Sequence, residues 1–242
     1  MATLPANGYS VENAAQFGWG SITGDLRPER VELLRRYVVG ETVLDAGCAG
    51  GGFVDYLERN GFHATGLDKY EMFLNVARLR GLKGRFVRAD LATPLPFADA
   101  SFDTTICFDV LEHVPDDAAA LMELARVTKR RLLITVPQED RWTNRYGLIF
   151  STYRDATHLR YYTPESLKCL SERVHPQRVD IFGEIPIPVR DLARDLIRPQ
   201  SRYPFLTTVY QRLFAFLLFR NAAPTLFLNL AAAIDVRDPQ SI

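Results

Sequence analysis

The chain has 242 residues, of which 47% are apolar and 24% are charged, a composition typical of a globular domain and unlike that of disordered or fibrous proteins. Its 29 basic residues balance its 29 acidic residues, so no excess of positive charge favours nucleic acid, and no nucleic-acid partner is expected. The three cysteines are widely spaced and odd in number, which argues against both a disulfide framework and a zinc–thiolate site.

The N-terminal residues 1–39 are expected to form a cap over the rest of the chain. They lack a charged segment followed by an apolar one, so no signal peptide is expected and the predicted location is cytoplasmic. Pro28 is suited to the first turn of a helix, and apolar residues follow it at helical spacing. This pattern predicts a helix over residues 28–38.

From residue 42 the chain alternates short apolar runs, rich in β-branched residues, with helical patterns. The alternation predicts an α/β fold, a Rossmann-like doubly wound sheet of buried parallel strands with helices on both faces. The expected elements are strands at 42–46, 63–68, 85–89, 102–108 and 131–136, helices at 51–60, 71–80 and 117–127, a further helix from Pro164, and strands at 178–184 and 226–236.

These elements predict four parts of the chain. After the cap at 1–39, residues 40–185 are expected to form the ligand-binding core. A helical insertion is expected at 186–225, and residues 226–242 are expected to supply the final strand of the core sheet and a tail.

The most informative segment is residues 43–52, Val-Leu-Asp-Ala-Gly-Cys-Ala-Gly-Gly-Gly. An apolar strand ends in an acid, and a glycine-rich turn leads directly into a helix, which is an arrangement that lets the backbone approach a small ligand. A dinucleotide site would have glycine at position 49, where this chain has alanine. Asp45 would also repel a pyrophosphate, whereas it would attract a cationic amine. The segment therefore favours a cofactor that carries an ammonium and a sulfonium group.

Two further acids follow the next two expected strands. Asp68 is placed to accept hydrogen bonds from ribose hydroxyls, and Asp90 to accept one from an adenine amino group. The alternative for each acid is that it caps the turn or helix that follows it. Because all three acids lie at carboxyl ends of strands, we expect them at one edge of the sheet.

On these motifs the chain resembles the class I S-adenosylmethionine-dependent methyltransferases, in the small-molecule group that includes ubiquinone-pathway enzymes. The resemblance covers roughly residues 40–170 and is carried by VLDAGCAGG at 43–51, TGLD at 65–68, RADLATPLPFADASFD at 88–103, FDVLEHVPD at 108–116, RLLITVP at 131–137 and THLRYYTPESL at 157–167. It implies a seven-stranded sheet whose last strand, 226–236, is antiparallel. The departure is Ala49, where the family usually has glycine.

The resemblance also implies which residues hold S-adenosylmethionine. Asp45 and the loop at 47–51 are expected to bind its amino-acid end, Asp68 its ribose, and Asp90 with Leu91 its adenine. The full set of expected cofactor-binding residues is Asp45, Gly47, Cys48, Ala49, Gly51, Asp68, Lys69, Asp90, Leu91 and Phe108.

Of the four histidines, His113 and His158 are expected to act on the acceptor. Methyl transfer from a sulfonium often requires removal of a proton from the acceptor, and histidine is the natural base near neutral pH. His113 follows the fourth strand at the ligand edge, and His158 precedes the helix at 164. The alternatives are that His113 caps a turn and that His158 only positions its loop.

A divalent-metal site is a further hypothesis. Asp109, Glu112 and His113 would lie on one side of a single helical turn, and His158 would be a fourth ligand for Mg²⁺ or a similar ion. The arrangement resembles the E-x-x-E-H site of ubiquinone-pathway O-methyltransferases and of small-RNA 2′-O-methyltransferases. Asp109 departs from it, because the family has glutamate there.

The insertion carries arginines every four residues and then an apolar segment, 203–220, that is too short to span a bilayer. This segment is expected to pack on the sheet or at a homodimer contact, or to lie on a membrane surface as a peripheral contact. The sequence therefore predicts a methyltransferase that acts on an oxygen of a small acceptor, and the apolar segment leaves open that this acceptor is apolar. A carbon or nitrogen methyltransferase, a nicotinamide dehydrogenase and a non-catalytic cofactor-binding module remain as alternatives.

Overall fold

The computed structural model describes residues 26–139, 155, 157–188 and 225–236, together with the isolated positions 205, 209, 212, 213, 216 and 217. The predicted cap at 1–39 and insertion at 186–225 therefore lie largely outside the described residues. Within the described part of the chain, no helix is long and apolar enough to cross a membrane.

The helices and strands follow the order predicted from the sequence. The described helices are α2 (Pro28–Tyr37), α3 (Gly52–Arg59), α4 (Glu71–Leu79), α5 (Asp117–Val127) and α7 (Pro164–Glu172), with a short 3₁₀ helix, η1 (Leu111–His113). The described strands are β1 (Thr42–Ala46), β2 (His63–Asp68), β3 (Arg85–Arg88), β4 (Phe102–Phe108), β5 (Thr128–Pro137), β6 (Arg178–Pro188) and β7 (Thr225–Asp235).

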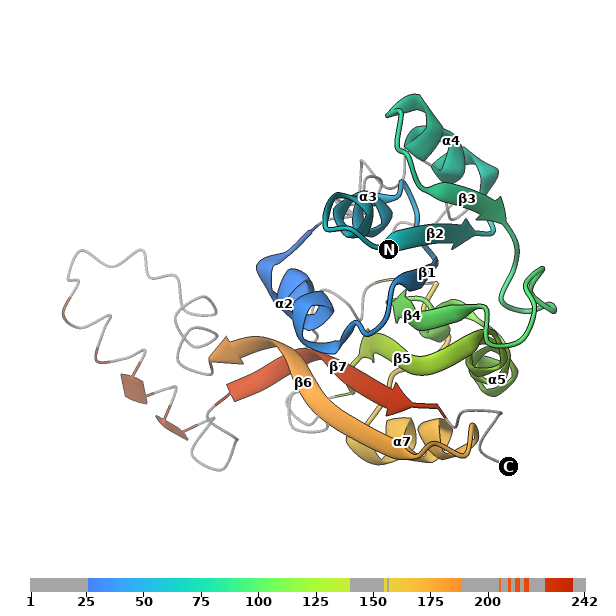
Figure 1. Cartoon of the computed structure of the whole chain (residues 1–242). Helices are drawn as coiled ribbons and strands as arrows, with labels where there is room; N and C mark the ends of the chain where they lie inside the picture. The colour runs from blue at the N-terminus through green and yellow to red at the C-terminus, as the bar shows by residue number, and fades with distance from the viewer. Residues whose placement is uncertain are drawn as a thin grey trace.

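The strands form one seven-stranded sheet in the order β3-β2-β1-β4-β5-β7-β6 (Figure 1). The first five strands in this order pair in parallel, and β7 pairs antiparallel with both β5 and β6. The predicted Rossmann-like α/β sheet with an antiparallel last strand is confirmed. The strand order reverses between β1 and β4, which is the place where open α/β sheets bind ligands.

Two apolar layers cover the two faces of this sheet. On one face, Leu44 and Leu132 of the strands pack against Leu121 and Leu124 of α5. On the other, the neighbouring strand residues pack against helices α2, α3 and α4, with Leu34, Leu57 and Leu74 fully or almost fully buried. Successive strand residues thus enter opposite layers, as the alternation along a strand requires.

Strand β6 extends past the predicted end at residue 184 and reaches Pro188. Pro186 and Pro188 had placed this part in the insertion, but both pair with β7. A proline lacks a backbone donor, and β6 tolerates it because β6 is the edge strand of the sheet.

Candidate functional site

The loop after β1 turns through a series of left-handed residues. Gly47 and Gly51 have φ of 86° and 77°, and Ala49 between them has φ of 44°. The amides of Gly47 and Cys48 both donate to the carbonyl of Leu67, at 2.7 and 2.9 Å, which ties the loop to the end of β2. The loop then enters α3 at its N-cap residue Gly51, so the unpaired amides of that helix face the same edge of the sheet.

Asp45 is a buried acid without a full set of partners. Its side chain is 2% exposed, and its Oδ2 atom accepts no hydrogen bond from any described residue. Burial, together with the nearby charge of Asp68, raises the pKa of Asp45 to about 8. A buried carboxyl group in this state gains a compensating charge when a cationic amine binds beside it. The geometry therefore fits the predicted ammonium group.

Asp68 is held by the loop that it supports. Its Oδ2 accepts a hydrogen bond from the Ala49 amide at 3.0 Å, and its Oδ1 accepts one from the Tyr70 amide at 2.8 Å. Burial raises the pKa of Asp68, and these two amides oppose the rise. Each carboxylate oxygen has a second lone pair, so hydrogen bonds from ribose hydroxyls remain compatible with these contacts.

The remaining residues predicted to bind the cofactor lie around the same edge with different surroundings. Asp90 caps its own turn by accepting a hydrogen bond from the Ala92 amide at 3.0 Å, and Leu91 after it is buried. Lys69 is exposed beside the Tyr70 ring. Phe108 is buried edge-on against Phe53. Asp90 thus shows the capping contact that was the alternative to adenine binding, and its cofactor role stays a prediction.

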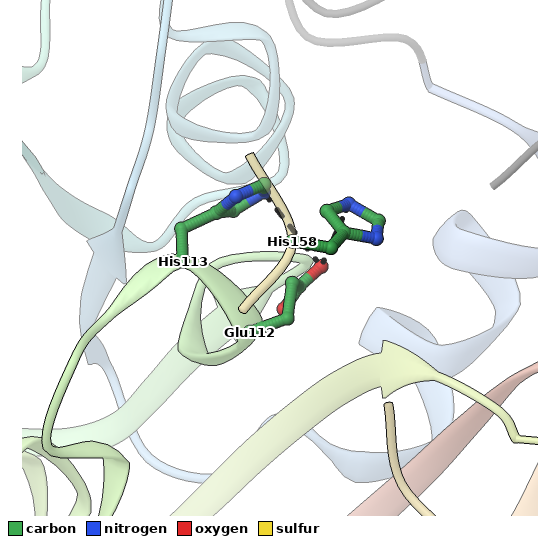
Figure 2. Close-up of side chains that lie close together, drawn as sticks. All are labelled: Glu112, His113 and His158. Atoms are coloured by element: carbon green, nitrogen blue, oxygen red, sulfur yellow. Dashed lines mark ion pairs between the residues drawn. The ribbon is translucent and has the colours of Figure 1, made fainter. Parts of the chain in front are cut away.

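His113 and His158 come together with Glu112, although 45 residues separate the two histidines in the sequence (Figure 2). Their ring centroids are 4.7 Å apart. The Nε2 atoms of His113 and His158 lie 3.9 and 4.0 Å from Glu112 Oε1. Glu112 is fully buried, and neither of its oxygens accepts a hydrogen bond from a described residue.

A hydrogen bond sets the tautomer of His113. Its Nδ1 lies 3.1 Å from the backbone carbonyl oxygen of Thr157 and 3.1 Å from the Thr157 hydroxyl. A carbonyl oxygen only accepts, and the Thr157 hydroxyl donates to Asp155, so His113 Nδ1 carries the proton. In the neutral ring, Nε2 is therefore the basic nitrogen.

Burial shifts the three side chains toward their neutral forms. It lowers the pKa of His113, and the nearby His158 lowers it further. Burial also lowers the pKa of His158. Burial and the charge of Asp109 raise the pKa of Glu112 well above its usual range. The histidines are thus kept unprotonated near neutral pH, as a proton acceptor requires.

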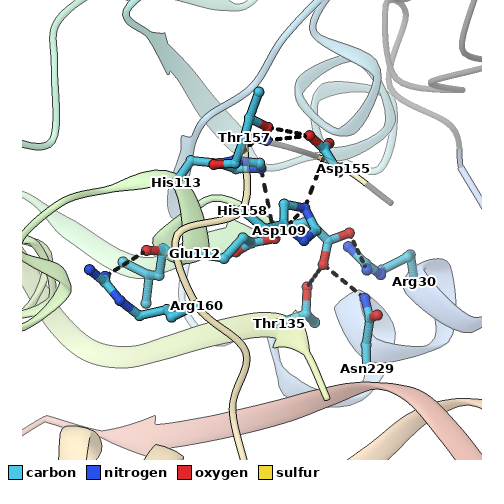
Figure 3. Close-up of polar contacts among 11 residues, drawn as sticks. Arg30, Asp109, Glu112, His113, Thr135, Asp155, Thr157, His158, Arg160 and Asn229 are labelled. Carbon is cyan, nitrogen blue, oxygen red and sulfur yellow. Dashed lines mark hydrogen bonds and ion pairs between the residues drawn. The ribbon is translucent and has the colours of Figure 1, made fainter. Parts of the chain in front are cut away.

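Asp109 does not lie on a helical turn with Glu112 and His113, so that part of the metal hypothesis is wrong. The 3₁₀ helix begins only at Leu111, and Asp109 itself has φ of 55°. Its Oδ2 accepts a hydrogen bond from Arg30 at 2.8 Å, and its Oδ1 accepts from Asn229 at 2.8 Å and from Thr135 at 3.2 Å (Figure 3). Both carboxylate oxygens are thus engaged, and Asp109 is not part of the group that could hold an ion.

The three remaining residues, Glu112, His113 and His158, do not fit Mg²⁺. Their ligand atoms all lie within 4.8 Å of one another. Two atoms that bind one metal ion through bonds of about 2.1 Å each can lie at most about 4.2 Å apart. The distances of 3.9 and 4.0 Å from the two histidine Nε2 atoms to Glu112 Oε1 are just below this limit. Two imidazoles and one carboxylate also suit Zn²⁺ or Fe²⁺, whereas Mg²⁺ prefers oxygen ligands.

Several residues of the site gave no clear signal in the sequence. Thr157 orients His113 through a contact that spans 44 residues, and Asp155 in turn accepts a hydrogen bond from the Thr157 amide. Arg30 lies in register with Leu33, Leu34 and Tyr37, so its position at the start of that apolar stripe was a signal that it points inward. The buried face of α2 consists of Arg30, Leu33 and Leu34, whereas Val31 is only half-buried.

Known proteins are similar to this chain over the segment that contains the loop after β1 and His113. Residues 44–134 match the family model described as a methyltransferase domain. The ubiquinone biosynthesis O-methyltransferase of Hahella chejuensis (strain KCTC 2396) is 39% identical over 111 residues, which cover 43% of this chain and 47% of that protein. The chain spans about half the length of the curated relatives it matches.

Solved structures share the fold over most of the chain. Phosphoethanolamine N-methyltransferase 2 of Haemonchus contortus, in complex with S-adenosyl-L-methionine, has a TM-score of 0.63 and 17% identity, and the match covers 97% of this chain and 59% of that one. A SAM-dependent methyltransferase from Archaeoglobus fulgidus has a TM-score of 0.59 and 20% identity, covering 84% of this chain and 91% of that one.

The left-handed conformation of Ala49 predicts a stability gain from glycine at this position. An alanine with positive φ is strained by about 1 kcal/mol, so Ala49→Gly should raise the free energy of unfolding by about that amount and Tm by about 2–4 °C. Calorimetry measures both quantities. Ala92→Gly, in an exposed turn with no positive φ, is the matched control and should lower Tm slightly. A lower Tm for Ala49→Gly would contradict this account.

The donor set of Glu112, His113 and His158 predicts weak affinity for Mg²⁺. After EDTA treatment and dialysis, about 5 mM MgCl₂ should leave Tm unchanged, because only a bound ion stabilises the folded state. Any stabilisation by Zn²⁺ should disappear in His158→Gln, which removes one imidazole. An increase in Tm with Mg²⁺ that His158→Gln abolishes would restore the magnesium hypothesis.

Proposed function

We propose that this chain, a class I S-adenosylmethionine-dependent methyltransferase by its fold and by the methyltransferase domain at residues 44–134, transfers a methyl group to an oxygen atom of a small molecule. The observation that carries the proposal is the position of His113. Its Nδ1 is fixed on the Thr157 carbonyl, so its basic Nε2 stands at the carboxyl end of β4, beside the strand that carries the cofactor loop.

The donor side of the site follows from the loop and the acids around it. Asp45 would bind the ammonium group of S-adenosylmethionine, the left-handed loop at 47–51 would follow its amino-acid end, and Asp68 would accept hydrogen bonds from the ribose. The bound cofactor supplies an electrophilic methyl group on its sulfonium. The buried loop and the sheet edge hold donor and acceptor in line, which is the main contribution that a protein makes to such a displacement.

On the acceptor side, His113 would take the proton. The hydroxyl proton of the acceptor would pass to Nε2 of His113 as the acceptor oxygen took up the methyl group that the bound cofactor would supply. The Nδ1–H bond to Thr157 stabilises the imidazolium that results, and Asp155 supports Thr157. Protonation of His113 would favour the ionised form of Glu112, whose Oε1 lies 3.9 Å from Nε2, although burial keeps Glu112 toward its neutral form before the reaction.

The acceptor that we propose is a phenol or catechol with an apolar substituent. The name of the matched relatives, ubiquinone biosynthesis O-methyltransferase, supports this class of acceptor. A phenolic oxygen also needs the loss of a proton that neutral His113 accepts. Formation of S-adenosylhomocysteine should be measured with catechols that carry or lack a prenyl chain. Tight cofactor binding without turnover of any acceptor would favour the non-catalytic binding module.

Part of the expected apolar segment at 203–220 is described. Phe205, Val209, Leu213, Phe216 and Leu217 are all exposed, by 45–76%. A packed position against the sheet would bury them, so their exposure supports a contact with something outside the chain. Whether that is a membrane surface or a second copy stays a prediction.

The raised pKa of Asp45 predicts how cofactor binding depends on pH. Below pH 8 the ligand-free carboxyl group holds a proton, which it must lose to pair with an ammonium group, so S-adenosylhomocysteine should bind more tightly as the pH rises from 6 to about 8. Calorimetry with Asp45→Asn should show affinity lower by roughly 10–100-fold and a flatter pH dependence. The exposed acid variant Asp99→Asn is the control and should bind as the wild type does.

The position of His113 predicts the effect of removing it. His113→Gln should lower kcat by about 100-fold or more, since a general base contributes at least that factor, while affinity for S-adenosylhomocysteine stays within a few-fold. Because burial lowers the pKa of His113, the wild-type rate should fall only below a pH of about 6.5. The control is His63→Gln, an exposed residue at the opposite end of β2. A His113→Gln enzyme with nearly full activity would rule out this base.

A further inference from the structure

Arg30 is a buried cation that joins three elements, its own helix α2, the end of β4 and β6. It lies in the first turn of α2 and is only 5% exposed. Its guanidinium donates to Asp109 after β4 at 2.8 Å (Figure 3). It also donates to Glu184 of β6 and lies 4.9 Å from the centroid of the Phe108 ring. A guanidinium suits this place because its planar fork serves two carboxylates and an aromatic face together.

The residue that Arg30 holds is a strained one. Asp109 has φ of 55°, a left-handed conformation that persists only where the surroundings enforce it. Besides Arg30, the donors that enforce it are Asn229 of β7 and Thr135 of β5, and the Asp109 amide donates to the Thr135 carbonyl at 3.0 Å. The chain therefore leaves β4 in a single fixed direction.

This direction determines where both halves of the site lie. Val110 comes next, and a Cβ added at Gly47 would meet its side chain at 2.3 Å, so Val110 packs directly on the cofactor loop. One residue later η1 begins, and it carries Glu112 and His113. A change in the backbone at Asp109 would therefore move the histidine relative to the cofactor loop.

We propose that Arg30 is a positioning residue, which fixes the carboxyl end of β4 through Asp109 and so holds η1 against the cofactor loop. The inference rests on the proposed function for its effect on turnover, but its effect on η1 is independent of any reaction. Arg30 acts on this part of the chain through its hydrogen bond to Asp109. The N-terminal helix α2, outside the matched segment 44–134, thereby becomes part of the active site.

If Arg30 only stabilised the fold, a second substitution that restored stability would also restore activity. Removing Arg30 leaves Asp109 and Glu184 near each other without a cation between them, which destabilises a buried cluster. A second substitution, Glu184→Gln, removes this repulsion and should restore much of the stability. If Arg30 positions η1, the double variant Arg30→Met with Glu184→Gln regains stability without regaining activity.

The test combines hydrogen exchange with kinetics on the full chain. In Arg30→Met, amide exchange over residues 109–114 should accelerate by about tenfold or more, whereas exchange over α5 should change little at a temperature where the protein is folded. The value of kcat should fall by about tenfold, with KM and S-adenosylhomocysteine affinity within about threefold. Arg30→Lys keeps the cation but not the fork, so it should recover part of the loss. The control on the same helix is Arg35→Met, which is exposed.

Each outcome has a separate meaning. Unchanged exchange over 109–114 in a folded Arg30→Met protein would overturn the inference, as would full recovery of kcat in the double variant with Glu184→Gln. Accelerated exchange with unchanged kcat would keep Arg30 as the residue that fixes η1 and would instead contradict the role proposed for His113. If Arg30→Met does not fold, Asp109→Asn breaks the same contact and should accelerate exchange over 109–114 in the same way.

Discussion

The site depends on carboxylates that are buried at the edge of the sheet without enough partners. Asp45 lies near the carboxyl end of β1, and Glu112 lies in η1 after β4; the strand order reverses between these two strands. Their unpartnered oxygens cost about 1–3 kcal/mol for each group, which no contact among the described residues repays. The sheet imposes this cost, because β1 and β4 are covered on both faces and fix where the two acids lie. A ligand that supplies a positive charge or a hydrogen-bond donor at these oxygens removes this cost, and the free energy recovered contributes to its binding.

Burial also gives the ligand-free site its electrostatic state. It raises the pKa of Asp45 and Glu112 and lowers the pKa of His113 and His158, so the acids and the bases all shift toward their neutral forms. The ligand-free site therefore carries little charge of its own before a ligand binds. In the reaction that we propose, a cationic cofactor would ionise Asp45, and a proton from the acceptor would ionise His113. The same property, low solvent access, therefore prepares both steps.

The sequence was sufficient where contacts are local or repeat along the chain. Strand ends, the glycine loop and the acids after β1 and β2 follow from patterns of a few residues, and the structure brings Asp45 and Asp68 together as expected. The sequence was not sufficient where one residue determines another at long range. Asp109 had the right spacing for a metal site, but Arg30 and Asn229, 79 and 120 residues away, hold it instead. No periodicity within the segment 109–113 contains that information.

The same distinction divides the site into two halves of different origin. The segment that matches the methyltransferase domain, 44–134, includes the cofactor loop, Asp68 and His113. It excludes two other parts of the chain that reach the same site, Arg30, which binds Asp109, and the segment 155–158, in which Thr157 binds His113 and His158 lies beside Glu112. Because the donor half is built from consecutive strands and loops, it is shared wherever that segment is shared. The acceptor half of the proposed site is assembled from contacts outside that segment, so in this proposal the choice of acceptor would depend on residues that the matched segment does not contain.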